Sequence, residues 1–365
     1  MSLVFSIITT LMWVIVLKAI APAFGVIDKP GGHKLHKGPV PLVGGLAIFG
    51  GLLITFLVIF KGGDSGMFLW NNTWAAFWVS AGFLVVVGMA DDRNGLRVSV
   101  RILTQVIATL LMVLWAGVEL FSLGHMFFAD DLVLGYLAIP VTVFGVVGGI
   151  NAMNMVDGID GLAGTLALVT VAALICLVAI GGGDNRFLVA LAGALMAFLL
   201  FNFPIPGRKQ AVVFMGDAGS MLLGFVLAWM MTILSQGNSK VMYPVTALWI
   251  FAVPLYDAVG NMLRRVYAGK SPFGADREHI HHLLLEKGLT VVQTVMCITG
   301  AALMFAGIGI AGYLYRVPEY FMFYAFLAIF AVYVVSIEYL WKTIKYNKIR
   351  AQAHTTPGEN LAKAQ

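Results

Sequence analysis

The side chains best suited to chemistry fall in three short stretches of the sequence. In the first, NAMNMVDGID at 151–160, side chains that carry oxygen recur at every third position: Asn151, Asn154, Asp157 and Asp160. On a helix or helical turn this spacing stacks side chains along one stripe, because residues three apart lie on the same face. Four amide and acid side chains on one stripe favour a functional site.

The other two stretches carry aspartates at the ends of apolar segments. VVFMGDAGS at 212–220 places Asp217 between two glycines, where it could cap the helix that follows. Glycine on both sides also permits close approach of the backbone to a ligand, which favours a functional role. Asp91 and Asp92 directly follow an apolar segment. Taken alone, a hydrated helix end would explain this pair equally well.

Acidic side chains gathered at one membrane face need a positive charge nearby. They repel one another and are costly near hydrocarbon unless something neutralises them. Mg²⁺ prefers oxygen ligands, needs only one or two carboxylates, and usually completes its shell with water and substrate phosphates. We therefore expect Mg²⁺ as the cofactor, with Mn²⁺ as a substitute, and phosphoryl-group chemistry as the reaction.

Basic residues could form a surface that binds an anionic substrate. They are Lys34, Lys37, Arg208, Lys209, Arg277, His279, His281 and His282. A zinc site is the competing interpretation of the histidines, but HIHH lacks the i, i+4 spacing of a zinc protease and has no cysteine nearby. The sequence contains no glycine-rich loop ending in Lys-Ser or Lys-Thr, which argues against a P-loop ATPase. We expect no nucleic-acid partner.

The elements that position these residues are membrane-spanning helices. Of the 365 residues, 60% are hydrophobic and only 11% are charged, and the mean hydropathy is +0.91. These values exclude an ordinary soluble domain. Because a helix needs about 20 apolar residues to cross the hydrocarbon, we predict an all-α polytopic membrane protein with about 11 transmembrane helices. They cover roughly residues 2–22, 42–60, 73–90, 102–118, 132–150, 161–180, 187–203, 218–235, 242–260, 292–314 and 320–341.

The distribution of lysine and arginine predicts the orientation, since these residues are retained on the cytoplasmic side. No positive charge precedes the first predicted span, and Lys18 lies near its end. The N-terminus is therefore expected in the periplasm and the C-terminus in the cytoplasm. On this topology all the stretches described above emerge on the cytoplasmic face, which would carry the active site. We expect residues 1–345 to form a single transmembrane domain and 346–365 a polar cytoplasmic tail.

The motifs together resemble one enzyme family. DD at 91–92, NAMNMVDGIDGLAG at 151–164, VFMGDAGS at 213–220 and DREHIHH at 276–282, in this order, resemble the polyprenyl-phosphate N-acetylhexosamine-1-phosphate transferases of glycosyltransferase family 4. The likeness is closest to the bacterial undecaprenyl-phosphate GlcNAc-1-phosphate branch, rather than the branch that transfers phospho-MurNAc-pentapeptide. Where the family often has a further acid after the pair, this chain has Asn94 and Gly95. That difference argues against a metal site built from several acids in this loop.

The resemblance implies a reaction and its location. Undecaprenyl phosphate would attack the β-phosphorus of UDP-GlcNAc, releasing UMP. This would be the first membrane step of O-antigen or related polysaccharide synthesis, in the bacterial inner membrane. Asp217, with Asn154, would hold Mg²⁺. Asp91 and Asp92 would position or deprotonate the lipid phosphate, unless one of them is a covalent nucleophile.

The resemblance also implies substrate contacts. Phe214 would stack on the uracil, and Asn202 would support the pyrophosphate. Asp157 and Asp160 would line the nucleotide pocket, and Asn151 on the same stripe is expected to contact substrate. Phosphates or sugar would be bound by Lys34 or Lys37, Arg277, His279, His281 and His282.

Two alternative functions stay open. The same reaction could use another UDP-N-acetylhexosamine, such as UDP-GalNAc or a deoxy sugar. An ion-coupled transporter should place its acids near mid-span. Here the patterned acids lie at the predicted cytoplasmic helix ends, and only Glu338 lies well inside a predicted span. Glycine pairs such as Gly44 and Gly45 permit close helix packing, within one subunit or in a homodimer.

Overall fold

The computed structural model describes residues 1–28, 38–59, 71–127, 130–208, 210–237, 240–272, 274 and 278–355, with side chains as far as residue 347. The helices are α1 (Ser2–Phe24), α2 (Gly44–Ile59), α3 (Asn72–Asn94), α4 (Val98–Leu114), the 3₁₀ turn η2 (Gly135–Leu137), α5 (Ala138–Val156), α6 (Leu162–Ile180), α7 (Arg186–Asn202), α8 (Gly216–Ser235), α9 (Pro244–Ile250), α10 (Ala252–Tyr267), α11 (Ile280–Glu286), α12 (Val291–Leu314) and α13 (Glu319–Thr355). Two short strands, β1 (Ile27–Asp28) and β2 (Val40–Pro41), pair antiparallel with Ile27 opposite Pro41.

The fold is that of an all-α polytopic membrane protein, as the composition predicts. Within the described ranges, seven helices are long and apolar enough to cross a membrane, and the number rises to eight if the bent pair α9–α10 forms one span. The apolar helices α2, α4 and α7 are shorter, with 16, 17 and 17 residues. Every predicted span overlaps one of these helices or the bent pair. The count of eleven spans and the orientation stay predictions.

One predicted span, residues 242–260, differs from a straight helix. α9 ends at Ile250, α10 begins at Ala252, and the two helices are bent by 81° relative to each other. Pro254 gives the physical reason, because proline lacks an N–H and its ring collides with the carbonyl four residues earlier, here that of Ile250. α9 therefore cannot continue through this point, and α10 leads off in a new direction.

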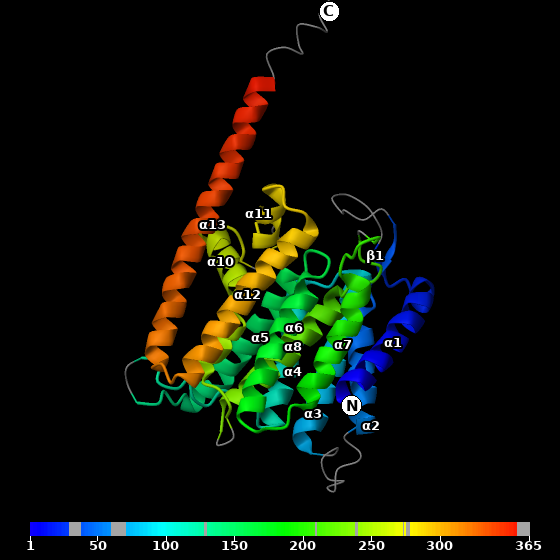
Figure 1. Ribbon diagram of the computed structural model, residues 1–365, viewed down its shortest axis with the longest axis vertical. Coiled ribbons are helices and arrows are strands. Elements are labelled where there is room, and N and C mark those ends of the chain that lie inside the picture. Colours follow the sequence, from blue (N-terminus) through cyan, green and yellow to red (C-terminus); the bar gives the residue numbers. More distant parts are fainter. Residues whose placement is uncertain are drawn as a thin grey trace, which may run out of the picture.

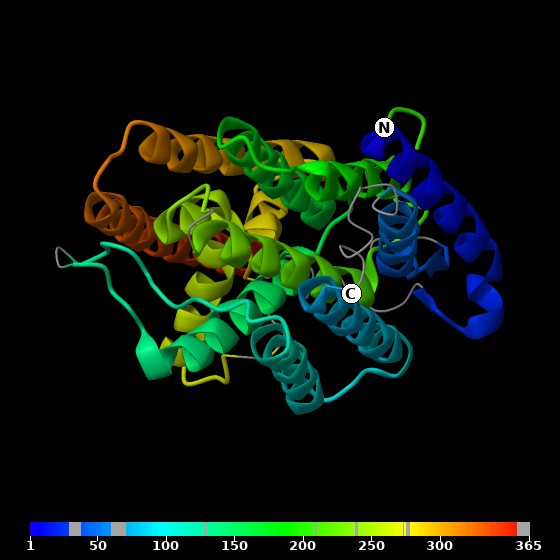
Figure 2. The same cartoon turned by 90° about the horizontal axis from the view of Figure 1, so that it is seen from below.

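α8 is the central helix of the bundle. It runs through the middle of the bundle and packs against α2, α3 and α5 (Figure 2). Most of its side chains are buried. Glycines bring two of its neighbours into backbone contact with its first turn. A Cβ on Gly45 of α2 would collide with Gly219, and a Cβ on Gly88 of α3 would collide with Ala218. The start of α8 is therefore fixed by backbone packing.

The last helix, α13, is the longest, with 37 residues. Its C-terminal part projects beyond the other helices, at the end of the bundle where α11 and β1 also lie (Figure 1). The helix continues through residues 346–355, which form the first part of the predicted polar tail.

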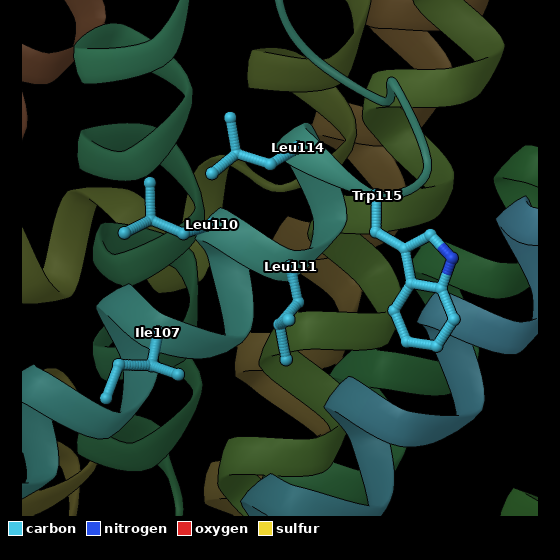
Figure 3. Close-up of a pocket in the computed structure, with 5 residues that line it drawn as sticks. All are labelled: Ile107, Leu110, Leu111, Leu114 and Trp115. Carbon is cyan, nitrogen blue, oxygen red and sulfur yellow. The ribbon is translucent and has the colours of Figure 1, made fainter.

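An apolar cavity of about 390 Å³ lies beside α4 (Figure 3). Its lining residues come from the second half of α4 and the residue that follows: Ile107, Leu110, Leu111, Leu114 and Trp115. None of these side chains can titrate or bind an ion. The cavity therefore offers a surface for hydrocarbon, and the side chains able to do chemistry lie elsewhere.

Candidate active site

Asp92 caps the central helix α8 from the neighbouring helix α3. Its Oδ1 accepts a hydrogen bond from the Asp217 N–H at 2.7 Å, and its Oδ2 accepts one from the Ala218 N–H at 3.2 Å. Met215, the residue that precedes α8, makes no side-chain cap. The first N–H groups of a helix have no partners within it and carry partial positive charge, so a carboxylate there is stabilising. The cap that Asp217 could have formed is therefore supplied by Asp92.

Asp217 directs its side chain toward α5. Asn154 donates from Nδ2 to Asp217 Oδ1 at 2.5 Å and to Ser220 Oγ at 2.9 Å. The Oδ1 of Asn154 accepts from Arg101 Nη2 at 3.0 Å. Because Arg101 binds the amide oxygen, the amide nitrogen must face the acid. The structure thus brings together Asp217 and Asn154, the two residues predicted as metal ligands.

Asp91 lies buried next to this contact, with 5% of its surface exposed. Its Oδ1 accepts from the Leu96 N–H at 2.6 Å, and Arg101 Nε lies 3.2 Å from its Oδ2. Arg101 therefore links Asp91 to Asn154. Arg101 is not among the site residues predicted from the sequence, although its contacts place it at the centre of the site.

A second polar pair lies one helical turn away from Arg101. Asn151 donates from Nδ2 to Gln105 Oε1 at 2.7 Å and to the Val147 carbonyl at 2.8 Å, and Gln105 is fully buried. The two contacts are thus Arg101 with Asn154 and Gln105 with Asn151. Arg101 and Gln105 are four residues apart on α4, and Asn151 and Asn154 are three apart on α5. This matching helical spacing is the sequence signal that could have identified Arg101. The amide nitrogen of Asn151 therefore forms a hydrogen bond between α5 and α4.

The stripe of oxygen-bearing residues leaves the helix after its second member. α5 ends at Val156, and Asp157 occupies the C-cap with φ −79° and ψ 46°. Burial first, and then the nearby charges of Asp217, Asp92 and Asp160, raise the pKa of Asp157 to about 8. The raised pKa of Asp157 reflects both its burial and the negative charge that the neighbouring acids bring to this turn.

Asp160 and Asn202 tie the same turn to the segment that precedes α8. Asp160 Oδ2 accepts from the Ala211 N–H at 2.8 Å. Asn202, which is 5% exposed, accepts from the Gly161 N–H at 2.8 Å and donates to the Val213 carbonyl at 3.0 Å. These contacts hold the backbone that leads to Phe214, so both side chains shape the loop that carries the predicted uracil-stacking residue.

Phe214 is held from its other side by the end of β2 and the start of α2. Its N–H donates to the Pro41 carbonyl at 2.9 Å, and its carbonyl accepts from the Gly44 N–H at 2.9 Å. The Gly45 N–H likewise donates to the Met215 carbonyl at 3.0 Å. The backbone of Phe214 is therefore fixed on both sides, while stacking of its ring on uracil stays a prediction.

The histidine segment, residues 279–282, packs against the turn that follows α5. A Cβ on Gly158 would overlap the ring of His281, so His281 lies directly on the residue after Asp157. Only 1% of His281 is exposed, and burial, followed by the charge of His282, lowers its pKa to about 3. His279 is also buried, whereas His282 is partly exposed. Of the other predicted site residues, Lys34, Lys37 and Arg277 lie outside the described residues.

Comparison with known proteins identifies the family. Residues 74–235 match the family model described as glycosyl transferase family 4. The chain is 38% identical over 362 residues to undecaprenyl-phosphate alpha-N-acetylglucosaminyl 1-phosphate transferase of Salmonella typhimurium, covering 97% of this chain and 96% of that protein. The proteins of the same name from Escherichia coli K12 and Haemophilus influenzae are 37% and 38% identical, over 93% and 91% of this chain and 91% and 92% of their own lengths.

The chain belongs to glycosyl transferase family 4. The resemblance inferred from the sequence motifs is thereby confirmed. The matched range contains Asp91, Asp157 and Asp217, the acids that the structure gathers at one end of the bundle. The histidine segment lies beyond the matched range but within the alignment to the Salmonella protein, which spans nearly the whole chain.

The donor atoms of this family 4 site suit Mg²⁺. Among the described residues, no three histidine, cysteine or acidic side chains are arranged to hold a metal ion by themselves. Mg²⁺ needs fewer protein ligands, because water and substrate phosphates complete its shell. Asp217 supplies a carboxylate, and the Asn154 oxygen keeps a second lone pair besides the one that accepts from Arg101. Ligation of Mg²⁺ by these two residues fits the site and stays a prediction.

Replacing Gly88 by alanine is expected to lower the initial rate of the transferase reaction about 10-fold. The added methyl collides with the Ala218 backbone, so the first turn of α8 must move away from α3, and displacement of catalytic groups by an ångström is costly. Gly82→Ala on the same helix is the matched control, because its nearest neighbour would be Phe49 at 3.4 Å. Initial rates of both variants test this, and equal activity would mean that the contact at Ala218 is unimportant.

Proposed function

We propose that the chain transfers GlcNAc-1-phosphate from UDP-GlcNAc to undecaprenyl phosphate. The products would be undecaprenyl-pyrophosphoryl-GlcNAc and UMP. The observation that carries this proposal is the identity of 38% across 97% of the chain to a protein of that printed name. The hydrogen-bonded cluster of Asp91, Asp92, Asp217 and Asn154 supports it, because phosphoryl transfer depends mainly on positioning and charge stabilisation.

In the proposed reaction an oxygen of the lipid phosphate attacks the β-phosphorus of the donor. A new P–O bond forms to that oxygen, and the bond between the β-phosphorus and the bridging oxygen breaks, so UMP leaves with the bridging oxygen. Asp91 or Asp92 accepts the proton of the lipid phosphate where that phosphate is protonated. Arg101, already paired with Asp91, supplies positive charge beside the reacting phosphates. When bound by Asp217 and Asn154, Mg²⁺ or Mn²⁺ would neutralise the pyrophosphate.

The membrane arrangement forms part of the proposal. About 11 spans, a periplasmic N-terminus and a cytoplasmic C-terminus would place the acids on the cytoplasmic face of the bacterial inner membrane. This is supported by Arg93, Arg97 and Arg101, which lie at the end of the bundle where the acids gather. Residues 1–345 would form the transferase domain, and 346–365 the tail.

The test is UMP release by the purified protein. Undecaprenyl phosphate, Mg²⁺ and a panel of UDP-sugars are supplied, and UDP-GlcNAc is expected to give the fastest release. Chelation of the metal should stop the reaction, and added Mg²⁺ or Mn²⁺ should restore it. Faster release with UDP-GalNAc or a deoxy sugar would correct the donor, and no release with any sugar would contradict the enzymatic proposal.

Sugar preference should depend on His282, the partly exposed member of the histidine segment. His282→Gln removes the imidazole that would form a hydrogen bond with the sugar. The preference for UDP-GlcNAc over UDP-GalNAc is therefore expected to change about 3- to 10-fold. His125→Gln, in the exposed loop before α5, is the matched control and should leave the ratio unchanged. Equal weakening of both donors would instead mean that His282 supplies only general positive charge.

A further inference from the structure

Asp257 is a buried carboxylate that the proposed reaction does not use directly. It lies on α10 with 1% of its surface exposed, and it meets donors from two other segments, the start of α11 and α13. Its Oδ2 lies 2.7 Å from His279 Nδ1, and its Oδ1 accepts from the Ile280 N–H at 2.8 Å and from Tyr333 Oη at 3.1 Å. A buried charge is costly unless its partners are close and well oriented. This carboxylate is therefore committed to neighbouring protein groups.

The hydrogen bonds around His279 assign its tautomer. Arg264 donates from Nη2 to Asn261 Oδ1 at 3.1 Å, so the amide nitrogen of Asn261 faces His279 Nε2, 3.2 Å away. Nε2 must then accept, and Nδ1 carries the proton that is donated to Asp257. Both ring nitrogens of His279 are thus used within the protein, and neither is left to contact a substrate.

The same contacts fix helix α11. His279 is its N-cap and forms no side-chain cap, whereas Asp257 accepts from the N–H of Ile280, the first residue of the helix. Asp257 therefore caps α11 from α10, as Asp92 caps α8 from α3. The residue that precedes the histidines is also held, because the Glu278 carbonyl accepts from Trp341 Nε1 at 3.0 Å.

The histidine that Asp257 fixes, His279, is connected to the acidic turn through His281. The rings of His279 and His281 are parallel, with centroids 5.6 Å apart and planes within 2°. His281 packs on Gly158 beside the acidic turn, and its ring centroid lies 4.2 Å from that of His282. The chain of contacts therefore runs from Asp257 through His279 and His281 to His282, which is partly exposed.

We propose that Asp257 is a positioning residue that acts through His279: it fixes the histidine as the Nδ1–H tautomer, caps α11, and so holds His281 and His282 against the acidic turn. This role rests on the proposed function, because its purpose is to place His282 for the transfer reaction. His279 is accordingly a positioning residue too, in place of the substrate contact predicted from the sequence.

Asp257→Asn tests the proposal, since it keeps the size of the side chain and removes its charge. We expect kcat to fall about 10- to 100-fold, as is typical when the partner of a functional histidine is lost. The KM for UDP-GlcNAc should change less than about 3-fold, since the damage lies in the placement of groups for transfer. Tyr333→Phe, which removes one bond to Asp257 without touching His279, is the control and should keep kcat within about 3-fold.

Two further measurements separate the possible outcomes. The losses in Asp257→Asn and His279→Gln should not add in the double variant, because both act through one contact. If Asp257→Asn does not purify, Asn261→Asp replaces it in the comparison with His279→Gln. That variant puts an acceptor where His279 Nε2 needs a donor. Additive losses, or an unchanged kcat in Asp257→Asn, would overturn the proposal.

The tautomer can be read without any activity. Nitrogen NMR shifts of His279 should report the Nδ1–H form in the unmodified protein and a changed form in Asp257→Asn. An Nε2–H tautomer in the unmodified protein would overturn the positioning role even if the enzyme is active. Absence of UMP release together with the Nδ1–H tautomer would contradict the proposed function and leave the assigned contact standing.

Discussion

Asp217→Asn is expected to lower turnover about 1000-fold while the protein still inserts and purifies normally. Asparagine keeps the volume and an oxygen that can accept from Asn154, but it removes the charge that would hold Mg²⁺ at the pyrophosphate. Losing one group that stabilises charge in the transition state typically costs a factor of about 100 to 1000. Single-turnover UMP release from purified protein is the measurement.

Asp184→Asn provides the matched control for this prediction. Asp184 lies in the loop between α6 and α7, where it pairs with exposed Arg186. An exposed ion pair of this kind contributes little to stability, so this variant should stay fully active. Near-normal activity of Asp217→Asn would contradict the metal role and leave Asp217 as a hydrogen-bond partner of Asn154.

Asp91→Asn and Asp92→Asn are each expected to lower turnover about 100-fold or more, for different reasons. Asp91 is paired with Arg101 and would act on the lipid phosphate, where loss of a proton acceptor costs about 100- to 10,000-fold. Asp92 caps α8 with both oxygens, and an amide would present a donor to one of the two N–H groups. That change should displace the start of α8 and with it Asp217.

The same pair separates a direct transfer from a covalent route. If the lipid phosphate attacks directly, enzyme mixed with UDP-GlcNAc alone releases no UMP. A nucleophilic aspartate would instead give a burst of UMP equal to the amount of enzyme. We expect no burst, and a burst that disappears in Asp91→Asn or Asp92→Asn would establish the covalent route.

Much of the site could be predicted because its residues carry local signals. The apolar segments identify the helices, and the three-residue spacing of Asn151 and Asn154 places them on one face of α5. The glycines around Asp217 favour a functional role for that acid. Each of these inferences needs only residues that are neighbours in the sequence.

The remaining features depend on contacts between distant segments. The cap of α8 by Asp92 joins residues 125 positions apart, and nothing near Asp217 in the sequence indicates it. Arg101 looks like any basic residue near a helix start until α4 and α5 pack together. The family resemblance predicts that His279 contacts substrate, and only the partners on both sides of its ring show that both ring nitrogens are used within the protein.

In the proposed reaction a phosphorylated sugar, and not the sugar alone, moves to the lipid. UDP-GlcNAc carrying radioactive phosphorus only at the β-position tests it most directly, with undecaprenyl phosphate as acceptor and the lipid extracted afterwards. We expect the label to enter the lipid fraction together with GlcNAc and the released nucleotide to be unlabelled UMP. Label that stays with the nucleotide as UDP, or lipid that gains no label, would contradict it.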